Sequence, residues 1–166
     1  MSNNGDPMVA LILNLKQKKR LGVLAQIEQL QYEPIQNRFH PLLFSVLPDN
    51  IGSTDYNSLR QAYRLVAPLM AIYPETTDIG SFGTALGQLG QHVSKSMIEE
   101  SLLIFRQFPR LYQADSILLR MVILMKNHHI LINWEQMVPD VRYWNDRIWQ
   151  QWMQDFIVIQ SDKEVQ

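Results

Sequence analysis

The sequence contains no cysteine among its 166 residues. This absence excludes disulfide-stabilised scaffolds, zinc sites built on thiolates and catalytic cysteine nucleophiles. A chain of this length buries roughly 70% of its unfolded surface when it folds, so neither a disulfide nor a structural metal is needed for stability. We therefore expect one compact unit held together by an apolar core, in a compartment such as the reducing cytoplasm.

A membrane-spanning segment and an excess of one charge are also missing from the sequence. The N-terminal apolar run, residues 8–15, is too short to cross a bilayer, and the lysines follow it, unlike those of a secretory signal. Lysine and arginine together number 15, against 16 aspartates and glutamates. The net charge is therefore close to zero and does not favour binding to nucleic acid. We expect a cytoplasmic protein without membrane contact.

What the sequence does contain is a series of helix signals. Asn133 stands three residues before Gln136, which is the spacing of a capping box, and Asn145 precedes a last apolar stripe. Asp115 likewise stands ahead of an apolar run and is expected to cap a helix. The last stripe recurs at i, i+1, i+4, i+5, i+8 and i+9, as one broad face of a helix does. Its members are Ile148, Trp149, Trp152, Met153, Phe156 and Ile157.

These signals predict an all-α protein. Turn-forming residues over 48–55 predict a loop, after which a helix is expected to open at Asn57 or Ser58. No alternating apolar and polar pattern longer than a few residues predicts a strand. We expect a compact helical bundle, either one unit or two packed helical halves, residues 1–93 and 94–166.

The aromatic side chains of the last stripe have two interpretations. Exposed aromatic rings beside cations stack on the bases of single-stranded nucleic acid, and Arg142 and Arg147 are close in the sequence. However, Trp149, Trp152 and Phe156 share their stripe with aliphatic residues, which is typical of a core face. We therefore expect these three side chains to be buried.

Two further motifs suggest chemistry but lack the residues that it needs. Residues 80–90 carry four glycines, without the Gly-Lys-Ser/Thr ending or the preceding strand of a phosphate-binding loop, so Gly83 and Gly87 are expected to allow close helix packing. His128 and His129 have no carboxylate at i+3 or i+4 to complete a metal site, and a polar helix end is expected. We identify no catalytic residue, no metal ligand and no cofactor site.

Four segments resemble one known family in order and spacing. Residues 63–68, Tyr-Arg-Leu-Val-Ala-Pro, are similar to a Tyr-Arg-Leu-Val-x-Pro element, and residues 81–86, Ser-Phe-Gly-Thr-Ala-Leu, to Ser-Leu-Gly-Arg-Ala-Leu. Residues 133–144 resemble an Asp-Trp-x-x-Met…Trp-Trp helix, and residues 152–156 resemble a segment ending Glu-Asp-Phe. The family is the small, CasB-type subunit of the type I-E CRISPR Cascade complex. Thr84 departs from the pattern, because the family carries arginine there.

This resemblance implies an all-helical, non-enzymatic subunit of an antiviral surveillance complex. Members of the family sit as a pair beside the Cascade subunits that carry the guide RNA. The implied partners are therefore those other protein subunits, the guide RNA within the complex and a second copy of the chain. The family's basic surface holds the displaced DNA strand during R-loop formation, while guide and target strand pair. The alternative is a helical adaptor that binds only protein partners through apolar helix faces.

The resemblance and the spacing of charges together give the candidate nucleic-acid-binding residues. They are Arg64, Arg106, Arg110, Arg120, Lys126, Arg142 and Arg147. Arg64 lies within the first matched segment, and Arg120 and Lys126 flank the matched C-terminal block. Each of these side chains could instead be a surface charge that pairs with a nearby carboxylate.

Overall fold

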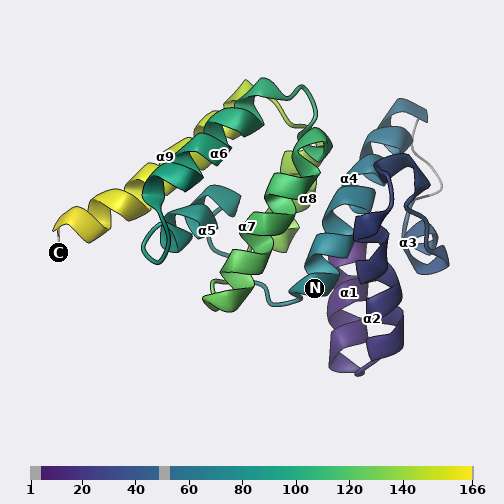
Figure 1. Cartoon of the computed structure of the whole chain (residues 1–166). Helices are drawn as coiled ribbons and strands as arrows, with labels where there is room; N and C mark the ends of the chain where they lie inside the picture. The colour runs from purple at the N-terminus through teal and green to yellow at the C-terminus, as the bar shows by residue number, and fades with distance from the viewer. Residues whose placement is uncertain (1–4, 49–52, 166) are drawn as a thin grey trace. The chain divides into compact units, whose positions relative to one another are not determined.

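The structure is a computed structural model, and it describes residues 5–48 and 53–165 (Figure 1). Within these ranges the chain forms nine α-helices and three short 3-10 helices, and its extended pairing is limited to one bridge between Thr76 and Ile132. The chain divides into two compact units after Pro74. No helix in the described ranges is both long and apolar enough to cross a membrane. The prediction of an all-α protein is confirmed.

The first compact unit is organised around the long helix α4, against which α1 and α2 pack (Figure 1). Its elements are α1 (Pro7–Gln17), α2 (Leu21–Gln29), η1 (Leu30–Tyr32), η2 (Ile35–Asn37), α3 (Pro41–Ser45) and α4 (Ser53–Ile72). Asp6 caps α1, since one carboxylate oxygen accepts from the Met8 amide at 2.8 Å. The other oxygen accepts from the Tyr63 hydroxyl at 3.2 Å. A single aspartate thereby begins α1 and fastens it to α4.

Helix α4 begins earlier than the sequence pattern predicts. Its first residue is Ser53, so the expectation that the helix opens at Asn57 or Ser58 is wrong. Asp55 lies in the first turn, where a carboxylate is favourable to the helix dipole. Residues 53–55 of the predicted loop therefore belong to the helix. Residues 49–52 of the predicted loop lie outside the described residues.

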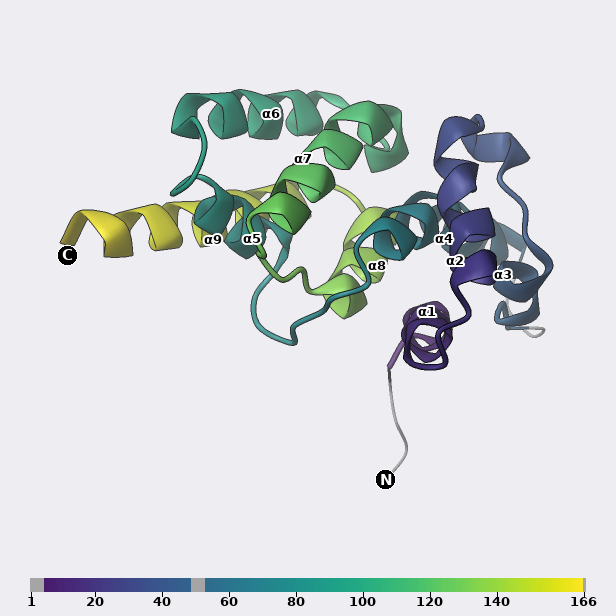
Figure 2. The ribbon, with the colours of Figure 1, turned by 60° about the horizontal axis from the view of Figure 1, so that its bottom comes forward.

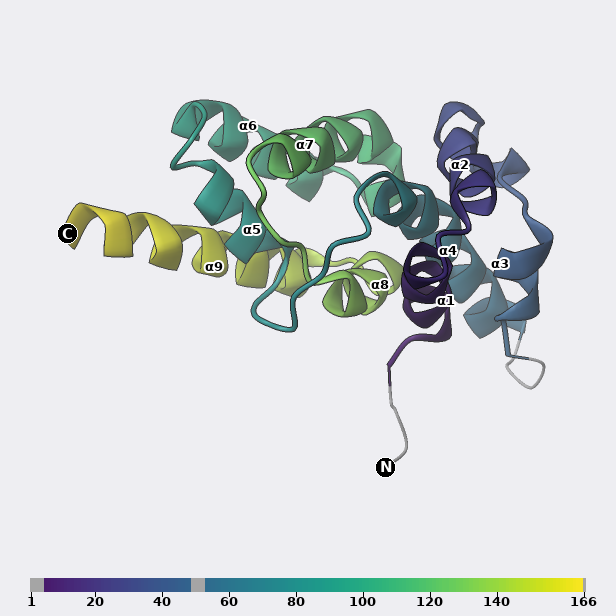
Figure 3. The same cartoon turned by 90° about the horizontal axis from the view of Figure 1, so that it is seen from below.

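In the second compact unit the short helix α5 lies along α9 (Figures 2 and 3). The elements of this unit are α5 (Phe82–Leu89), α6 (Lys95–Gln107), η3 (Leu111–Ala114), α7 (Asp115–Asn127), α8 (Trp134–Arg142) and α9 (Asp146–Val165). A Cβ at Gly83 would collide with the backbone of Trp152, and one at Gly87 would lie 2.7 Å from the Ile159 Cβ. The prediction that Gly83 and Gly87 allow close helix packing is confirmed.

Aromatic side chains fill the core between α5, α6 and α9. Trp152 is fully buried, and its ring centroid lies 5.1 Å from that of Phe82 on α5 and 6.2 Å from that of Phe105 on α6. Phe156 and Trp149 are also buried. The expectation that the aromatic stripe faces the core is confirmed, so these rings are not available for stacking on bases.

Helix starts in the second unit mostly follow local capping chemistry. The Asn133 side chain accepts from the Gln136 amide at 3.1 Å, and the Asn145 side chain accepts from the Ile148 amide at 3.0 Å. Both residues are caps as expected, but the capping box that the spacing of Asn133 and Gln136 suggested is not formed, because the Gln136 side chain donates to Asp140 at 2.9 Å. Asp115 is not the cap of α7, contrary to the expectation, because it is the first residue of that helix. Its carboxylate lies in the first turn, where it is favourable to the helix dipole.

The boundary between the compact units, after Pro74, differs from the boundary between residues 93 and 94 that the sequence predicts. Helix α5 belongs with α9 in the second unit, whereas a division between residues 93 and 94 places it in the N-terminal half. The cause is the glycine face of α5, which brings its backbone against a helix that comes much later in the chain.

Candidate nucleic-acid interface

Arg106, in the last turn of α6, is held by two partners from the start of α9. Its Nε donates to the Asp146 carboxylate at 3.0 Å, and its guanidinium carbon lies 4.5 Å from the centroid of the Trp149 ring. The indole N–H of Trp149 donates to the Leu102 carbonyl at 2.6 Å, which fixes the ring against α6. Arg106 and Asp146 are both about half exposed, so their ion pair positions the guanidinium more than it stabilises the fold.

Beside this pair a groove of about 300 Å³ opens between the end of α6 and the turn that joins α8 to α9, and we call it the α6–α9 groove. Trp144 lines it, and its indole N–H donates to the Phe108 carbonyl at 3.2 Å. Arg110 follows Phe108 by two residues, and Arg142 precedes Trp144 by two. Of the candidate cations Arg106 lines the groove, and three more lie within two residues of its lining: Arg110, Arg142 and Arg147.

The charges around the α6–α9 groove are only partly neutralised. Arg106 pairs with Asp146, as the surface-charge interpretation expects. Arg110 and Arg147 are exposed, and no carboxylate of residues 5–48 or 53–161 pairs with either. Arg142 is half-buried, with its guanidinium carbon 4.9 Å from the centroid of the neighbouring Tyr143 ring. Arg110 and Arg147 are therefore two exposed guanidinium groups near the groove that no acid of these residues engages.

Arg120 and Lys126 lie apart from this cluster, on α7. The Nη2 atom of Arg120 is 3.3 Å from the sulfur of Met97, a weak acceptor near the start of α6 and thus at the opposite end of that helix from Arg106. Lys126 lies in the last turn of α7, where a positive charge is favourable to the helix dipole. The two side chains are about 120° apart around the helix axis. They therefore do not extend the groove cluster into one strip.

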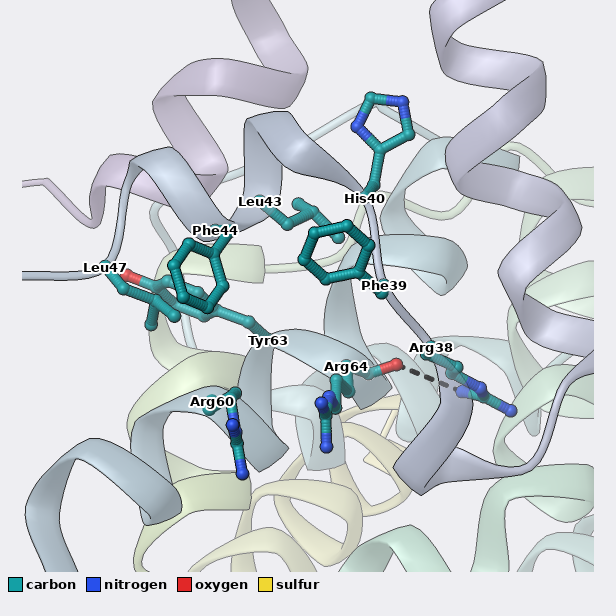
Figure 4. A pocket seen from close by; sticks show the side chains of 9 residues that line it. All are labelled: Arg38, Phe39, His40, Leu43, Phe44, Leu47, Arg60, Tyr63 and Arg64. Carbon is teal, nitrogen blue, oxygen red and sulfur yellow. Dashed lines mark hydrogen bonds between the residues drawn. The ribbon is translucent and has the colours of Figure 1, made fainter. Parts of the chain in front are cut away.

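Arg64 lies in the first unit, where it lines a narrow cleft between α4 and residues 38–47 (Figure 4). Arg60 precedes it by one turn of α4. The pKa of Arg64 is lowered, first because burial removes water from the guanidinium and then because the charge of Arg60 is close. Phe39 and Phe44 line the same cleft. Arg64 therefore has an apolar and cationic setting that differs from that of the other candidates.

Arg38 holds the backbone around this cleft together. Its side chain is only 3% exposed, and its guanidinium donates to the carbonyls of Gln31 at 3.0 Å, Glu33 at 2.9 Å and Arg64 at 3.1 Å. Burial of the charge is offset by these bonds to backbone acceptors. Sequence reasoning missed this cleft, and the four-residue spacing of Arg60 and Arg64 is the one sequence signal that could have indicated it.

Near the ends of α5 and α7 lies a cavity of about 450 Å³. The rings of His92 and His128 stack there with their centroids 4.9 Å apart, and Thr84 lines the same cavity. Helix α7 ends at Asn127, and His129 has a φ of 57°, so the expected polar helix end is confirmed. Over the part of the chain that the structure describes, no three side chains are grouped to ligate a metal ion.

The sequence matches the family model described as CRISPR-associated protein Cse2 over residues 23–156, which is well over half of the chain. The chain belongs to the Cse2 family. Cse2 proteins are small subunits of type I-E CRISPR Cascade, so the family that the four segments indicated is confirmed. All seven candidate cations fall within the matched residues. No curated protein sequence matches the chain.

The Cse2 chain also shares its fold with a solved structure, the crystal structure of M. ruber CasB. The TM-score is 0.75 at 23% sequence identity, and the match covers 96% of this chain and 98% of that chain. At this identity the likeness shows the fold. Because it covers nearly the whole of both chains, most of residues 5–48, which the four segments leave out, belong to the same fold.

Proposed function

We propose that this Cse2-family protein is a non-enzymatic Cascade subunit that holds the displaced DNA strand during R-loop formation. Its partners in this proposal are the other Cascade protein subunits, the guide RNA within the complex, the displaced strand and a second copy of the chain, in the cytoplasm. Family membership supports the place in Cascade. The cations around the α6–α9 groove support contact with phosphate groups.

The observation that carries the strand-holding role is the pair of exposed guanidinium groups of Arg110 and Arg147 at one end of the second unit. Arg106 adds a third, because Asp146 engages its Nε while the side chain stays about half exposed over Trp149. A guanidinium presents a planar fork of donors that matches phosphate oxygens. In this proposal the displaced strand contacts all three groups.

A few phosphate contacts are sufficient for this role. R-loop formation exchanges a DNA duplex for an RNA–DNA duplex of similar stability, so modest contacts to the displaced strand shift the balance. Three phosphate contacts to a single strand correspond to a salt slope of about −2, and affinity then falls roughly tenfold or more between 50 and 200 mM salt. A net charge of −1 is compatible with this behaviour, because the contacts are local.

The remaining candidates take secondary places in the proposal. Arg120 and Lys126 lie apart from the groove, on α7, and are not among the three contacts counted above. Arg142 is half-buried against Tyr143 and contributes to the positive potential near the groove rather than a direct contact. Arg64 belongs to the first unit and lines a cleft of different chemistry.

Replacing Arg110 and Arg147 by glutamine tests the proposal. Cascade assembled with this double variant is expected to bind target DNA more weakly at low salt, with a salt slope smaller by about 1.4, because two single-strand phosphate contacts are lost. The matched control is Lys18→Gln with Arg20→Gln, which removes two exposed charges outside the residues that match the family. An unchanged slope in the first variant, or an equal loss in the control, would contradict the proposal.

A helical adaptor that binds protein alone is the second candidate function. Exposed apolar side chains on α6, α7 and α9 favour it, namely Leu103, Ile104, Ile123, Ile157 and Val158. Such faces suit helix-to-helix contact with a partner. Affinity for single-stranded DNA separates the two functions, because an adaptor shows no salt-dependent binding of DNA by itself and adds none to the complex.

A further inference from the structure

The first compact unit carries a cleft that the strand-holding proposal does not use, and we call it the arginine–aromatic cleft (Figure 4). Phe39 and Phe44 form its apolar part, with ring centroids 5.9 Å apart and a tilt of 57° between the ring planes. These side chains are 58% and 51% exposed, whereas Leu43 and Tyr63 in the same lining are buried. The cleft therefore leaves two phenyl rings in contact with water, and covering them is favourable.

Arg60 and Arg64 supply the positive charge of this cleft. They come from consecutive turns of α4, and Figure 4 shows their guanidinium groups pointing in the same direction. The Nη2 atom of Arg60 donates to the Asn57 side chain at 3.3 Å, and its Nε is buried without a hydrogen-bond partner. No carboxylate pairs with either arginine within the described ranges. Two like charges one turn apart repel each other unless an anion lies between them.

The two phenyl rings and the two arginines of the cleft together favour a ligand that joins an anion to an apolar group. A carboxylate can accept hydrogen bonds from both guanidinium groups and removes their repulsion. An apolar side chain close to that carboxylate can lie against Phe39 and Phe44 and exclude water from their exposed faces. Aspartate or glutamate near an apolar residue in a polypeptide supplies both groups on one short segment.

A nucleotide fits this cleft less well. The enclosed space of the cleft is only about 20 Å³, little more than a water molecule needs, so a ligand lies mostly across the mouth of the cleft and against its two exposed rings. The polar groups of its wall are already engaged, since Arg38 donates to three carbonyls and the His40 ring nitrogens contact the Leu42 amide at 3.2 Å and the Gln26 side chain at 3.0 Å. Apart from the two arginines, a base would find little to satisfy its polar edge.

We propose that the arginine–aromatic cleft binds a short segment of another protein in which an aspartate or glutamate stands within two residues of an apolar side chain. The carboxylate accepts from Arg60 and Arg64. The apolar side chain lies against Phe39 and Phe44. This docking function belongs to the first unit and is independent of DNA contact by the second unit.

Selection of random heptapeptides displayed on phage tests the proposal with the full-length protein. Peptides are selected on the wild type after counter-selection on the Arg60→Gln and Arg64→Gln double variant. The enriched sequences are expected to share an acidic residue within two positions of a leucine, isoleucine, methionine or aromatic residue. A synthetic peptide of the enriched sequence is expected to bind the double variant at least about tenfold more weakly, because two charge-assisted hydrogen bonds are lost.

Two further variants separate charge, apolar contact and folding. Phe44→Ala keeps both arginines and is expected to weaken binding of the same peptide, whereas Lys18→Gln with Arg20→Gln removes the same number of charges elsewhere and is expected to leave it unchanged. Circular dichroism and melting temperature verify that each variant is folded. Three results would overturn the proposal: no peptide enriched over the double variant, enriched peptides without a carboxylate, or binding of a short oligothymidine that depends on Arg60 and Arg64.

Discussion

Replacing Gly83 by alanine is expected to destabilise this Cse2 protein, although alanine is the better helix former. Gly83 lies in α5 at its contact with α9, where a Cβ would collide with the carbonyl group and the Cα of Trp152. These atoms belong to the backbone of a 20-residue helix, so they cannot move aside as the end of a flexible side chain can. The methyl group must therefore push α5 away from α9.

The magnitude follows from three contributions. Overpacking of this kind costs about 1–3 kcal/mol, and the upper part of the range applies because the obstacle is backbone. Separating the helices also weakens the contact between the Phe82 and Trp152 rings, whose centroids are 5.1 Å apart; such a contact contributes about 0.5–1.5 kcal/mol. Alanine returns at most about 1 kcal/mol through its helix propensity. We expect a net loss of roughly 2 kcal/mol, or a melting temperature lower by about 4–8 °C.

Gly22→Ala is the matched control, because nothing lies within 4 Å of a Cβ at that position in α2. It is expected to stabilise the protein by about 0.4–1 kcal/mol. Urea unfolding followed by circular dichroism gives both free energies, and tryptophan fluorescence reports the second unit, which contains all four tryptophans. A Gly83→Ala variant as stable as the wild type would refute the close contact of α5 with α9.

Three further sites test the cap, the core and the surface. Asp6→Ala is expected to lower the free energy of unfolding by about 0.5–2 kcal/mol, because α1 loses its cap and the Tyr63 hydroxyl loses its acceptor. An unchanged free energy of unfolding would exclude the stabilising role of the Asp6 carboxylate. Asp140→Ala leaves the Trp152 indole N–H buried without its acceptor and is expected to cost about 1–3 kcal/mol in urea unfolding. Burial raises the pKa of Asp140 above its ordinary 3.8, so the folded state binds more protons than the unfolded state. As the pH rises from 3.8 through the raised pKa, the wild type is therefore expected to lose stability relative to Asp140→Asn. A gain in stability over this pH range would contradict the prediction. Arg106→Gln is expected to change stability by less than about 1 kcal/mol, because its ion pair is exposed; a larger loss in thermal melting would show a structural role.

Features that depend on neighbouring residues could be predicted from the sequence. Asn133 and Asn145 act on amides three residues later in the chain, so their spacing is sufficient to identify them as caps. Gly83 and Gly87 recur on one helix face, and that regularity predicts close packing without indicating the partner helix. The order of the four matched segments predicted the family, which is now shown.

Features that join distant residues could not be predicted in this way. Arg106 finds its carboxylate 40 residues later in the chain, and the sequence shows both only as interleaved charges. The arginine–aromatic cleft exists only because residues 38–47 fold back onto α4, where they meet Arg60 and Arg64. The start of α4 at Ser53 is also hidden in the sequence, because the first turn of the helix has the composition of a loop. The role of the seven cations in DNA binding stays a prediction.

The affinity for target DNA of Cascade assembled with and without this chain tests the central claim most directly. We predict that the complex containing the chain binds target DNA more tightly at 50 mM salt, and that this advantage shrinks roughly tenfold by 200 mM salt. We also predict that adding back the Arg110→Gln and Arg147→Gln variant restores only a small part of it. Equal affinities with and without the chain at low salt would contradict the claim that this protein holds the displaced strand.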